Sequence, residues 1–332
     1  MTGDSDVRRV TVADVDEHAV AESGVDLSVP IAGNLRFANP ITTASGCFAS
    51  GAEIDRFFDI AELGAIVVKS VTLEPREGLP TPRMFETPSG MLNAIGLQNP
   101  GIDGWLEKDL PFLQGKNVPV VVSIAGSTTQ EFADVASRLR GRVGIAAVEV
   151  NLSCPNVEHR GLVFACEPGP SNEVVNAVRR SLPDVPIFAK LTPDVTDITR
   201  IGLTVVEAGA TGVSAINTTL GMAIDPETGR PRIANTFGGL SGPAIRPIAV
   251  RAVHQLYRTL GPEVPIIGMG GVRSVGDVVE MIRAGASMVA IGTATFADPF
   301  VPQRLVRELR RWLAARGMRS VGELRGAVTY WR

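Results

Sequence analysis

The sequence predicts an α/β protein, a (β/α)8 TIM barrel with insertions over the mouth formed by the carboxyl ends of its strands. Three observations favour this fold: eight short apolar runs, amphipathic segments between several of them, and a polar residue or glycine after nearly every run. The runs are continuously apolar, as expected of parallel strands buried on both faces. A doubly wound open sheet has the same alternation of strands and helices, and it is the alternative fold.

The expected elements follow one another in regular order. The strands are predicted at residues 40–44, 65–68, 119–124, 146–150, 186–189, 212–216, 264–267 and 288–291. Amphipathic helices are predicted at residues 129–139, 172–181, 198–208, 249–260 and 275–284. Two intervals, 70–118 and 218–263, are longer than one helix requires and contain Gly- and Pro-rich sequence. We expect these insertions to cover the mouth.

The residues at the strand ends decide between the two folds. These residues are Ser45, Lys69, Ser123, Asn151, Lys190, Asn217, Gly270-Gly271 and Gly292-Thr293. In a closed barrel all eight carboxyl ends open onto one mouth, so these residues converge on a single site. An open sheet would leave several of them far from its crevice. The pattern therefore favours the barrel.

The length of 332 residues permits one barrel or two average domains, and the composition is that of an ordinary globular protein. We interpret residues 27–332 as a single barrel and residues 1–26 as a flexible extension, with docking onto a neighbouring subunit as the alternative for the extension. The extension lacks the basic start and the apolar core of a signal peptide. The net charge of −3 does not suggest a nucleic-acid partner, and the chain has no apolar run of about 18 residues that would suggest a membrane span. Three cysteines without a C-x-x-C pair predict neither a disulfide framework nor a metal site. We expect a cytoplasmic protein.

Glycines and lysines at the strand ends indicate anion binding. Gly270-Gly271 and Gly292-Thr293 follow the last two strands, where barrels commonly bind a phosphate through bare backbone N–H groups. Lys69 and Lys190 also end strands. Each lysine could form a Schiff base, as in aldolases, or supply a fixed positive charge for a reduced flavin or an anionic substrate. A lysine tip in solvent is the third interpretation.

Carboxamides and one cysteine add further candidates. Asn93, Asn151, Asn156 and Asn217 each offer a donor and an acceptor, which suits a ring with alternating C=O and N–H groups. Cys154 lies in a polar loop after the fourth strand, where a thiolate could accept a proton. By contrast, Cys47 and Cys166 are interpreted as small buried apolar residues.

Six segments together resemble the class 1 dihydroorotate dehydrogenases, and most closely the class 1B form, which works with a second, electron-transferring subunit. The segments are TASGCF at 43–48, TPRMFET at 81–87, NAIGLQNPG at 93–101, NLSCPNV at 151–157, GGLSGPAI at 238–245 and GMGGV at 268–272. The resemblance extends over nearly the whole chain from about Leu27.

The resemblance implies an FMN-binding barrel that oxidises dihydroorotate to orotate in pyrimidine biosynthesis. It implies that FMN contacts Ala44, Ser45, Gly46, Lys69, Asn151, Lys190, Ile216 and Gly242, with its phosphate at Gly270, Gly271, Gly292 and Thr293. Ser123 stands where the family usually has an asparagine that contacts the flavin, and it is included as a cofactor residue. The substrate residues implied are Lys69, Asn93, Ala94, Ile95, Gly96, Leu97, Asn151, Asn156, Asn217 and Thr218. Cys154 is implied as the base that removes a proton from C5 while a hydride passes from C6 to the flavin.

The resemblance also implies partners. A separate subunit that carries FAD and an iron–sulfur cluster would pass the electrons to NAD, and a homodimer would form the core of the assembly. The alternatives are a class 1A-like enzyme that uses fumarate, an oxidoreductase for another dihydropyrimidine, and, in a different reaction class, a phosphate-binding lyase or aldolase that uses Lys69 or Lys190 as a Schiff base.

Overall fold

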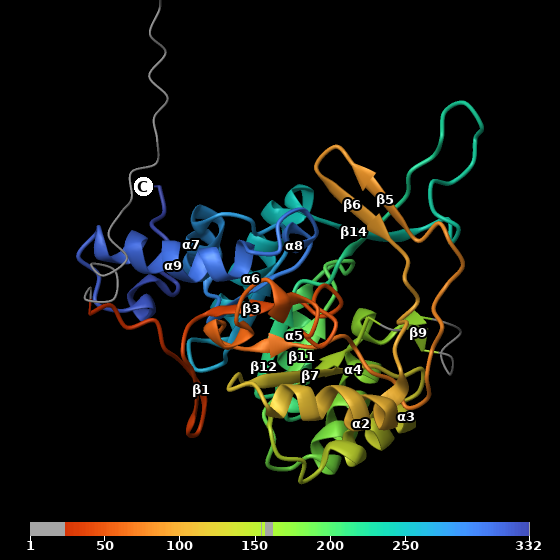
Figure 1. Ribbon diagram of the computed structural model, residues 1–332, viewed down its shortest axis with the longest axis horizontal. Coiled ribbons are helices and arrows are strands. Elements are labelled where there is room, and N and C mark those ends of the chain that lie inside the picture. The colour runs from red at the N-terminus through yellow and green to blue at the C-terminus, as the bar shows by residue number, and fades with distance from the viewer. Residues whose placement is uncertain (1–23, 154, 157–161, 332) are drawn as a thin grey trace, which may run out of the picture.

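The computed structural model describes residues 24–153, 155–156 and 162–331, and its centre is an eight-stranded parallel sheet (Figure 1). The strands lie in the order β3-β16-β15-β12-β11-β8-β7-β4. Their bounds are β3 (Ile41–Thr43), β4 (Ile66–Val67), β7 (Val120–Ile124), β8 (Ile145–Asn151), β11 (Ile187–Leu191), β12 (Gly212–Ala215), β15 (Ile266–Met269) and β16 (Met288–Ile291). Each of the eight predicted strands is therefore confirmed, to within a few residues at its ends.

Hydrogen bonds between the first and second strands close the sheet. Thr42 pairs with Ala65 in a parallel bridge, and its Oγ1 donates to the carbonyl of Ala65 at 2.7 Å. The hydroxyl of Thr43 donates to the carbonyl of Val67 at 3.0 Å and accepts from the Val67 N–H at 2.8 Å. Since β3 also pairs with β16, the sheet is a barrel and not the open alternative.

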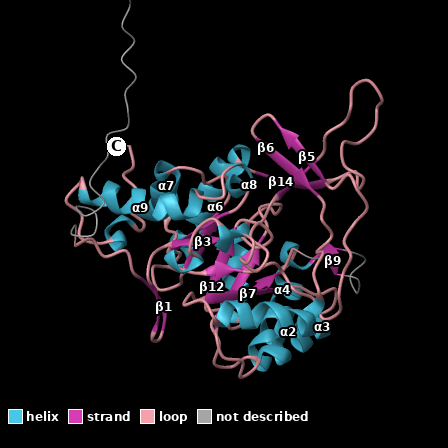
Figure 2. Ribbon diagram, viewed as in Figure 1, coloured by secondary structure: helices cyan, strands magenta, loops and turns pink. Residues whose placement is uncertain are grey.

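Helices surround the barrel in chain order (Figure 2). They are α2 (Gly101–Gln114), α3 (Thr129–Leu139), α4 (Pro168–Ser181), α5 (Ile198–Glu207), α6 (Arg246–Leu260), α7 (Val275–Ala284), α8 (Ala294–Ala297) and α9 (Val301–Ala314). The predicted bounds of α3 and α7 are confirmed. Helices α4 and α6 begin earlier than predicted because each carries a proline in its first turn, where the missing N–H has no intrahelical partner to lose.

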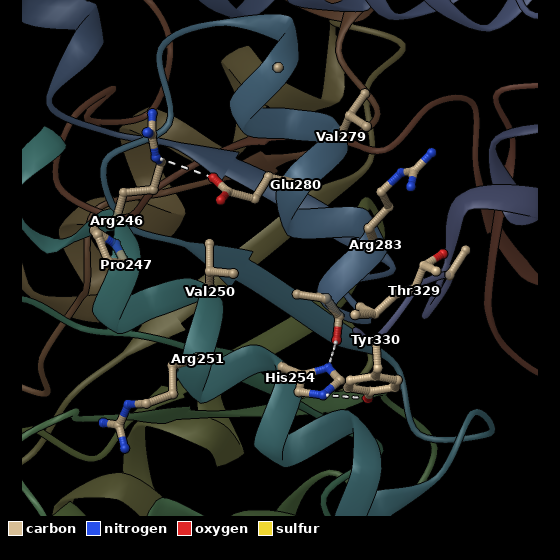
Figure 3. Close-up of a pocket in the computed structure, with 14 residues that line it drawn as sticks. Arg246, Pro247, Val250, Arg251, His254, Val279, Glu280, Arg283, Thr329 and Tyr330 are labelled. Atoms are coloured by element: carbon tan, nitrogen blue, oxygen red, sulfur yellow. Dashed lines mark hydrogen bonds and ion pairs between the residues drawn. The ribbon is translucent and has the colours of Figure 1, made fainter. Parts of the chain in front are cut away.

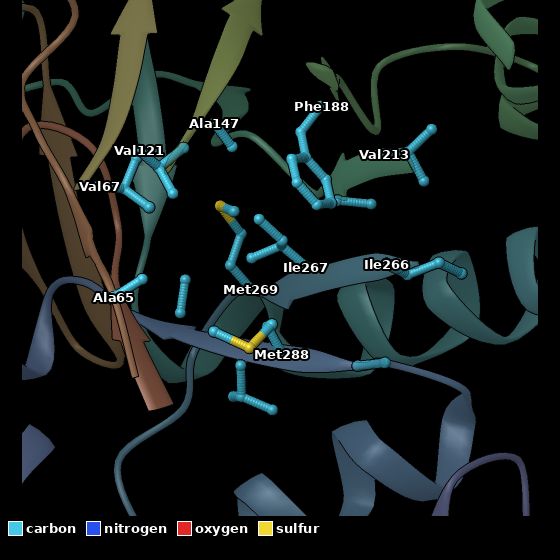
Figure 4. Packing of buried hydrophobic residues seen from close by; sticks show 14 of the residues in the cluster. Ala65, Val67, Val121, Ala147, Phe188, Val213, Ile266, Ile267, Met269 and Met288 are labelled. Atoms are coloured by element: carbon cyan, nitrogen blue, oxygen red, sulfur yellow. The ribbon is translucent and has the colours of Figure 1, made fainter. Parts of the chain in front are cut away.

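The core of the barrel is apolar. Figure 4 shows side chains of β4, β7 and β15 grouped between the strands, among them Val67, Val121 and Met269. All three residues are at most 4% exposed. Close packing of this kind makes the strands a rigid support for the residues at their ends.

The two long insertions meet in a second, antiparallel sheet. Strands β5 (Met84–Thr87) and β6 (Gly90–Asn93) come from the first insertion, and β13 (Thr219–Gly221) and β14 (Gly238–Ser241) come from the second. Their order is β13-β14-β6-β5. The hydroxyl of Thr293, just after β16, donates to Ser241 Oγ at 2.8 Å, so β14 ends over the barrel mouth. The prediction that the insertions cover the mouth is therefore confirmed.

Short elements complete the described chain. A hairpin of β1 (Val29–Ala32) and β2 (Leu35–Phe37) precedes the barrel, and β9 (Pro155–Asn156) pairs with β10 (Leu162–Val163). Val25 is buried, and Asp26 pairs with Ser320 near the other end of the chain. Residues 1–23 lie outside the described residues, so the flexible extension stays a prediction. Within the described residues, no helix is long and apolar enough to cross a membrane.

Replacing Thr43 with valine tests the closure of the barrel. Thr43→Val keeps the shape of the side chain but leaves the buried N–H and C=O of Val67 without this partner. We expect the free energy of unfolding to fall by about 1–3 kcal/mol, measured by urea denaturation. The control is Thr204→Val, which makes the same change at a half-buried position on the surrounding helix α5. Equal stability of the two variants would contradict a closing role for Thr43.

Candidate active site

Polar side chains from four neighbouring strands form a continuous hydrogen-bonded chain at the barrel mouth. Ser45 Oγ lies 3.2 Å from Ser70 Oγ, and Ser70 Oγ lies 2.9 Å from Ser123 Oγ. The Ser123 hydroxyl donates to Glu149 Oε1 at 3.1 Å. This chain joins the end of β3, the end of β4, and strands β7 and β8. Two predicted site residues, Ser45 and Ser123, are thereby connected.

The chain ends in a buried ion pair. Lys190 Nζ on β11 donates to Glu149 Oε1 on β8 at 3.4 Å. The Glu149 side chain is fully buried, and that of Lys190 is 6% exposed. The second carboxylate oxygen, Glu149 Oε2, has no hydrogen-bond partner among the described residues, and neither does Ser214 Oγ on the adjacent β12. Burying polar atoms without hydrogen-bond partners is costly. At the interior end of the mouth these two oxygens can therefore still bind a further polar group.

Two asparagines lie beside this chain. Asn151, the last residue of β8, donates through Nδ2 to Ser70 Oγ at 3.4 Å. Asn217 follows β12 and donates to Asn151 Oδ1 at 3.1 Å, while its own N–H binds the carbonyl of Leu191 at 2.8 Å. The structure thus brings together two carboxamides that the sequence places 66 positions apart.

Strand β14 brings Asn93 and Thr218 to the same side of the mouth. Asn93 pairs in register with Gly239 and donates to its carbonyl at 3.2 Å. A Cβ atom on Gly239 would lie 2.1 Å from Thr218 Oγ1, so only glycine allows this approach. The predicted segment of Asn93, Ala94, Ile95, Gly96 and Leu97 is half-buried throughout, and Leu97 has a positive φ of 54°.

Backbone glycines form the opposite corner of the mouth. Gly242 and Gly271 both have positive φ, and a Cβ on Gly271 would lie 2.7 Å from the Gly242 carbonyl oxygen. A Cβ on Gly270 would lie 3.5 Å from Ile216 Cγ1, and one on Gly292 would lie 3.2 Å from Ala44 Cβ. Together with Thr293, these are the residues in which the sequence predicts phosphate and flavin contacts. We call Gly242, Gly270, Gly271, Gly292 and Thr293 the glycine corner.

Lys69 lies just after the end of β4, beside the loop that follows β3. Its N–H binds the carbonyl of Ala49 at 2.8 Å, which holds the loop after β3 against the end of β4. A Cβ on Gly46 would lie 3.5 Å from Lys69 Nζ, so the bare backbone of Gly46 leaves room beside the ammonium group. Both Lys69 and Lys190 act electrostatically on Cys47, which indicates that the two cations face the same region.

Two of the three cysteines, Cys47 and Cys166, lie within the described residues, and both have a raised pKa. Burial raises the pKa of the Cys47 thiol to about 11, although the charges of Lys190 and Lys69 oppose the shift. Burial also raises the pKa of Cys166, with smaller contributions from Asp194 and Glu167. Both thiols are therefore protonated at neutral pH and are poor bases. Cys47 nevertheless lies at the mouth, since its Sγ is 3.4 Å from the position of a Cβ on Gly292. Cys154 lies outside the described residues.

Sequence reasoning missed several residues of the site. Glu149, Ser70, Ser241 and Ser214 were absent from the predicted set, although all are on or next to barrel strands or β14. Glu149 was the one with a clear signal, because a carboxylate in the middle of an otherwise apolar strand requires a partner. Asn156 is described only as part of the backbone of β9, so its predicted contact with substrate stays a prediction.

A separate groove lies on the outer side of the barrel. It has a volume of about 830 Å³ and lies between α6, α7 and residues 327–330. Figure 3 shows Arg251, His254 and Tyr330 at one end of it and Arg246 with Glu280 at the other. No residue predicted for the site lines the groove, so the mouth and not this groove is the candidate active site.

Comparisons with known proteins identify the family of the chain. A family model described as dihydroorotate dehydrogenase matches residues 27–313. Proteins named dihydroorotate dehydrogenase B (NAD(+)), catalytic subunit, are similar to the chain. The one from Geobacter sp. strain M21 is 47% identical over 91% of this chain and 98% of its own length. The one from Desulforamulus reducens is 48% identical over 92% of this chain and 99% of its own.

A solved structure gives the same result for the fold. The crystal structure of DHODH from Eimeria tenella in complex with ferulenol matches with a TM-score of 0.76 and 26% sequence identity, over 91% of this chain and 88% of that one. The family model covers most of the chain, and the curated relatives are far above 30% identity over nearly its full length. This chain is therefore a member of the dihydroorotate dehydrogenase family.

Proposed function

We propose that the chain is the FMN-binding catalytic subunit of an NAD-linked dihydroorotate dehydrogenase, which oxidises dihydroorotate to orotate in pyrimidine biosynthesis. One observation carries the proposal: two lysines, two hydrogen-bonded asparagines and the glycine corner all open onto a single barrel mouth. Cations suit the carboxylate of the substrate, carboxamides suit its ring amides, and bare backbone suits a phosphate. Relatives that cover nearly the whole chain carry the same activity in their names.

The residues of the mouth fit FMN in two respects. The glycine corner presents backbone at the ends of β15 and β16, where barrels commonly bind phosphate. At the other end, Lys190 supplies a buried positive charge, and the unpartnered oxygens of Glu149 and Ser214 provide further polar capacity. Ala44, Ser45, Gly46 and Ile216 would line the space between these ends. Bound FMN would supply the hydride acceptor for the reaction.

The protein's own residues would bind and orient the substrate and move its proton. Lys69 would hold the substrate carboxylate, while Asn93, Asn151 and Asn217 would fix the plane of the ring. We assign the removal of the C5 proton to Cys154, whose loop starts directly after Asn151. Burial raises the pKa of the Cys47 thiol, so still less thiolate forms there at neutral pH than on an ordinary cysteine.

A second subunit would accept the electrons. The names of the relatives specify both NAD(+) and a catalytic subunit, which indicates that another subunit completes their enzyme. We assign FAD and an iron–sulfur cluster to that subunit, as the resemblance to the class 1B enzymes implies. Within the described part of this chain, no group of three or more His, Cys, Asp or Glu side chains could hold a metal ion. Two copies of the catalytic chain would form the core of the assembly. Full-rate NAD reduction by the purified chain alone, or efficient use of fumarate, would contradict this assignment.

An anaerobic absorbance scan from about 300 to 550 nm tests the function directly. We expect a flavin spectrum that bleaches when dihydroorotate is added, because hydride transfer reduces the flavin. Flavin that stays oxidised with dihydroorotate but bleaches with dihydrouracil would move the substrate to another dihydropyrimidine. If reconstitution with FMN gives no flavin spectrum, the Schiff-base lyase becomes the better assignment, and borohydride trapping on Lys69 or Lys190 would identify it.

Replacing the proposed base should slow chemistry without releasing the cofactor. Cys154→Ser replaces the thiol with a hydroxyl, which is a far weaker acid and forms almost no anion at neutral pH. General-base catalysis typically raises the reaction rate by about 10²–10⁴-fold. We expect the rate of flavin reduction by dihydroorotate at neutral pH to fall by about that factor in stopped-flow measurements, with FMN still bound. Cys166→Ser is the matched control and should reduce normally. Near-normal reduction in Cys154→Ser would remove Cys154 from the proposed role.

Glu149→Gln tests the electrostatic role of the buried ion pair. The substitution removes a negative charge while keeping the size of the side chain, so Lys190 would stabilise reduced flavin more strongly. We expect the midpoint potential of bound flavin to rise by about 30 mV, which corresponds to about 1.4 kcal/mol for a two-electron couple. Ser287→Ala, which alters an uncharged buried group at the amino end of β16, on the side of the barrel away from the mouth, is the control. An unchanged potential in Glu149→Gln would show that the pair has no effect on the flavin.

A further inference from the structure

An ion pair connects the two loops that form most of the glycine corner. Arg246 is the first residue of α6 and follows Gly242 after one short 3-10 turn, η4 (Pro243–Ile245). Asp277 lies in the first turn of α7 and follows Gly270 and Gly271. Arg246 Nη1 donates to Asp277 Oδ1. The pair therefore joins the loop before α6 to the loop before α7.

Asp277 uses both of its carboxylate oxygens. While Oδ1 binds Arg246, Oδ2 accepts hydrogen bonds from the backbone N–H groups of Arg273 and Ser274, both at 3.0 Å. Its side chain is 8% exposed. Two hydrogen bonds to the loop and one charged contact to the neighbouring helix hold the carboxylate in a single position. The course of the loop after Gly271 is thus tied to the position of α6.

Close backbone contact makes this connection direct. A Cβ on Gly271 would lie 2.7 Å from the Gly242 carbonyl oxygen, 2.8 Å from Arg246 Cβ and 3.1 Å from Arg246 N. The two loops therefore touch at Gly242 and Gly271, with no side chain between them. A shift of α6 relative to α7 would displace the backbone N–H groups of the corner.

A neighbouring acid offers a matched comparison. Arg246 Nε also binds Glu280 Oε2 at 3.2 Å, one turn further along α7, and Figure 3 shows this contact at the edge of the outer groove. The Glu280 side chain is 50% exposed, and among the described residues it makes no hydrogen bond to the glycine loops. Solvent-exposed pairs of this kind contribute little. Arg246 thus has one buried partner that is bound to the loop and one exposed partner that is not.

We propose that Arg246 and Asp277 are a positioning pair that holds the glycine corner in the shape that binds the phosphate of the cofactor. The inference rests on the proposed flavin function and adds two residues that do not themselves contact the cofactor. Because the pair acts on the phosphate end alone, its loss affects a flavin that carries a phosphate more than one that lacks it.

The test measures the Kd of flavin for the full-length, flavin-free chain. Quenching of flavin fluorescence is the signal that reports binding. FMN and riboflavin, which lacks the phosphate, are titrated separately into the wild type, Asp277→Asn, Arg246→Gln and Glu280→Gln. We expect Asp277→Asn and Arg246→Gln to raise the Kd for FMN about tenfold while the Kd for riboflavin changes little. The double variant should lose no more than either single variant, and Glu280→Gln should bind like the wild type.

Four results would overturn the inference. An unchanged Kd for FMN in both single variants would show that the pair does not position the corner. Equal weakening of FMN and riboflavin would indicate a general structural role, as would a loss in Glu280→Gln that equals the loss in Asp277→Asn. If Asp277→Asn fails to fold, judged by circular dichroism, Arg246→Gln decides alone. A wild-type chain that binds neither flavin would instead overturn the flavin function, and the pair's role with it.

Discussion

Closure of the parallel sheet is the constraint on which the site depends. Thr42 and Thr43 connect the first strand to the second through side-chain hydrogen bonds, in the place where regular pairing is short. Once closed, the barrel directs all eight carboxyl ends to one mouth. Residues as distant in sequence as Ser45, Asn151 and Asn217 then belong to one hydrogen-bonded group. An open sheet with the same strands would separate them.

The interior of the mouth has an unusual electrostatic arrangement. A buried ion pair such as Lys190–Glu149 is a poor source of stability, because removing two charges from water offsets most of their attraction. Glu149 additionally leaves one oxygen without a partner among the described residues. A protein gains little in stability from this arrangement, whereas a fixed charge in a water-poor site acts strongly on a bound redox group. The cost is better explained by chemistry than by folding.

The sequence predicts the barrel well because its signals are local. Each buried strand is a short apolar run, and each helix such as α3 or α7 has its own amphipathic period and cap, so their bounds follow from neighbouring residues. Four residues of the glycine corner, Gly270, Gly271, Gly292 and Thr293, are predicted from their place after the last two strands, whereas Gly242 is implied by the family resemblance alone. The antiparallel sheet was not predicted, because Asn93 and Gly239 pair across 146 positions and no local pattern encodes that register.

The same limit explains which site residues were found and which were missed. Residues at strand ends, such as Lys190 and Asn151, stand out because a polar group there interrupts an apolar run. Glu149 lies inside its run, and Ser241 lies on β14, whose position depends on long-range pairing. Arg246 and Asp277 are ordinary charged residues near the starts of two helices, and only the contact between them reveals their relation to the corner. The role of Cys154 stays a prediction.

Ser123 illustrates how one departure from the family pattern fits the surrounding structure. The resemblance places an asparagine here that contacts the flavin, and serine is too short to make the same contact. Its hydroxyl instead lies between Ser70 and Glu149, at 2.9 Å and 3.1 Å, and the residue is fully buried. The position is therefore occupied by a residue that orients the buried carboxylate, which in turn binds Lys190. Under the proposed function, this position would act on the flavin through Glu149 and Lys190.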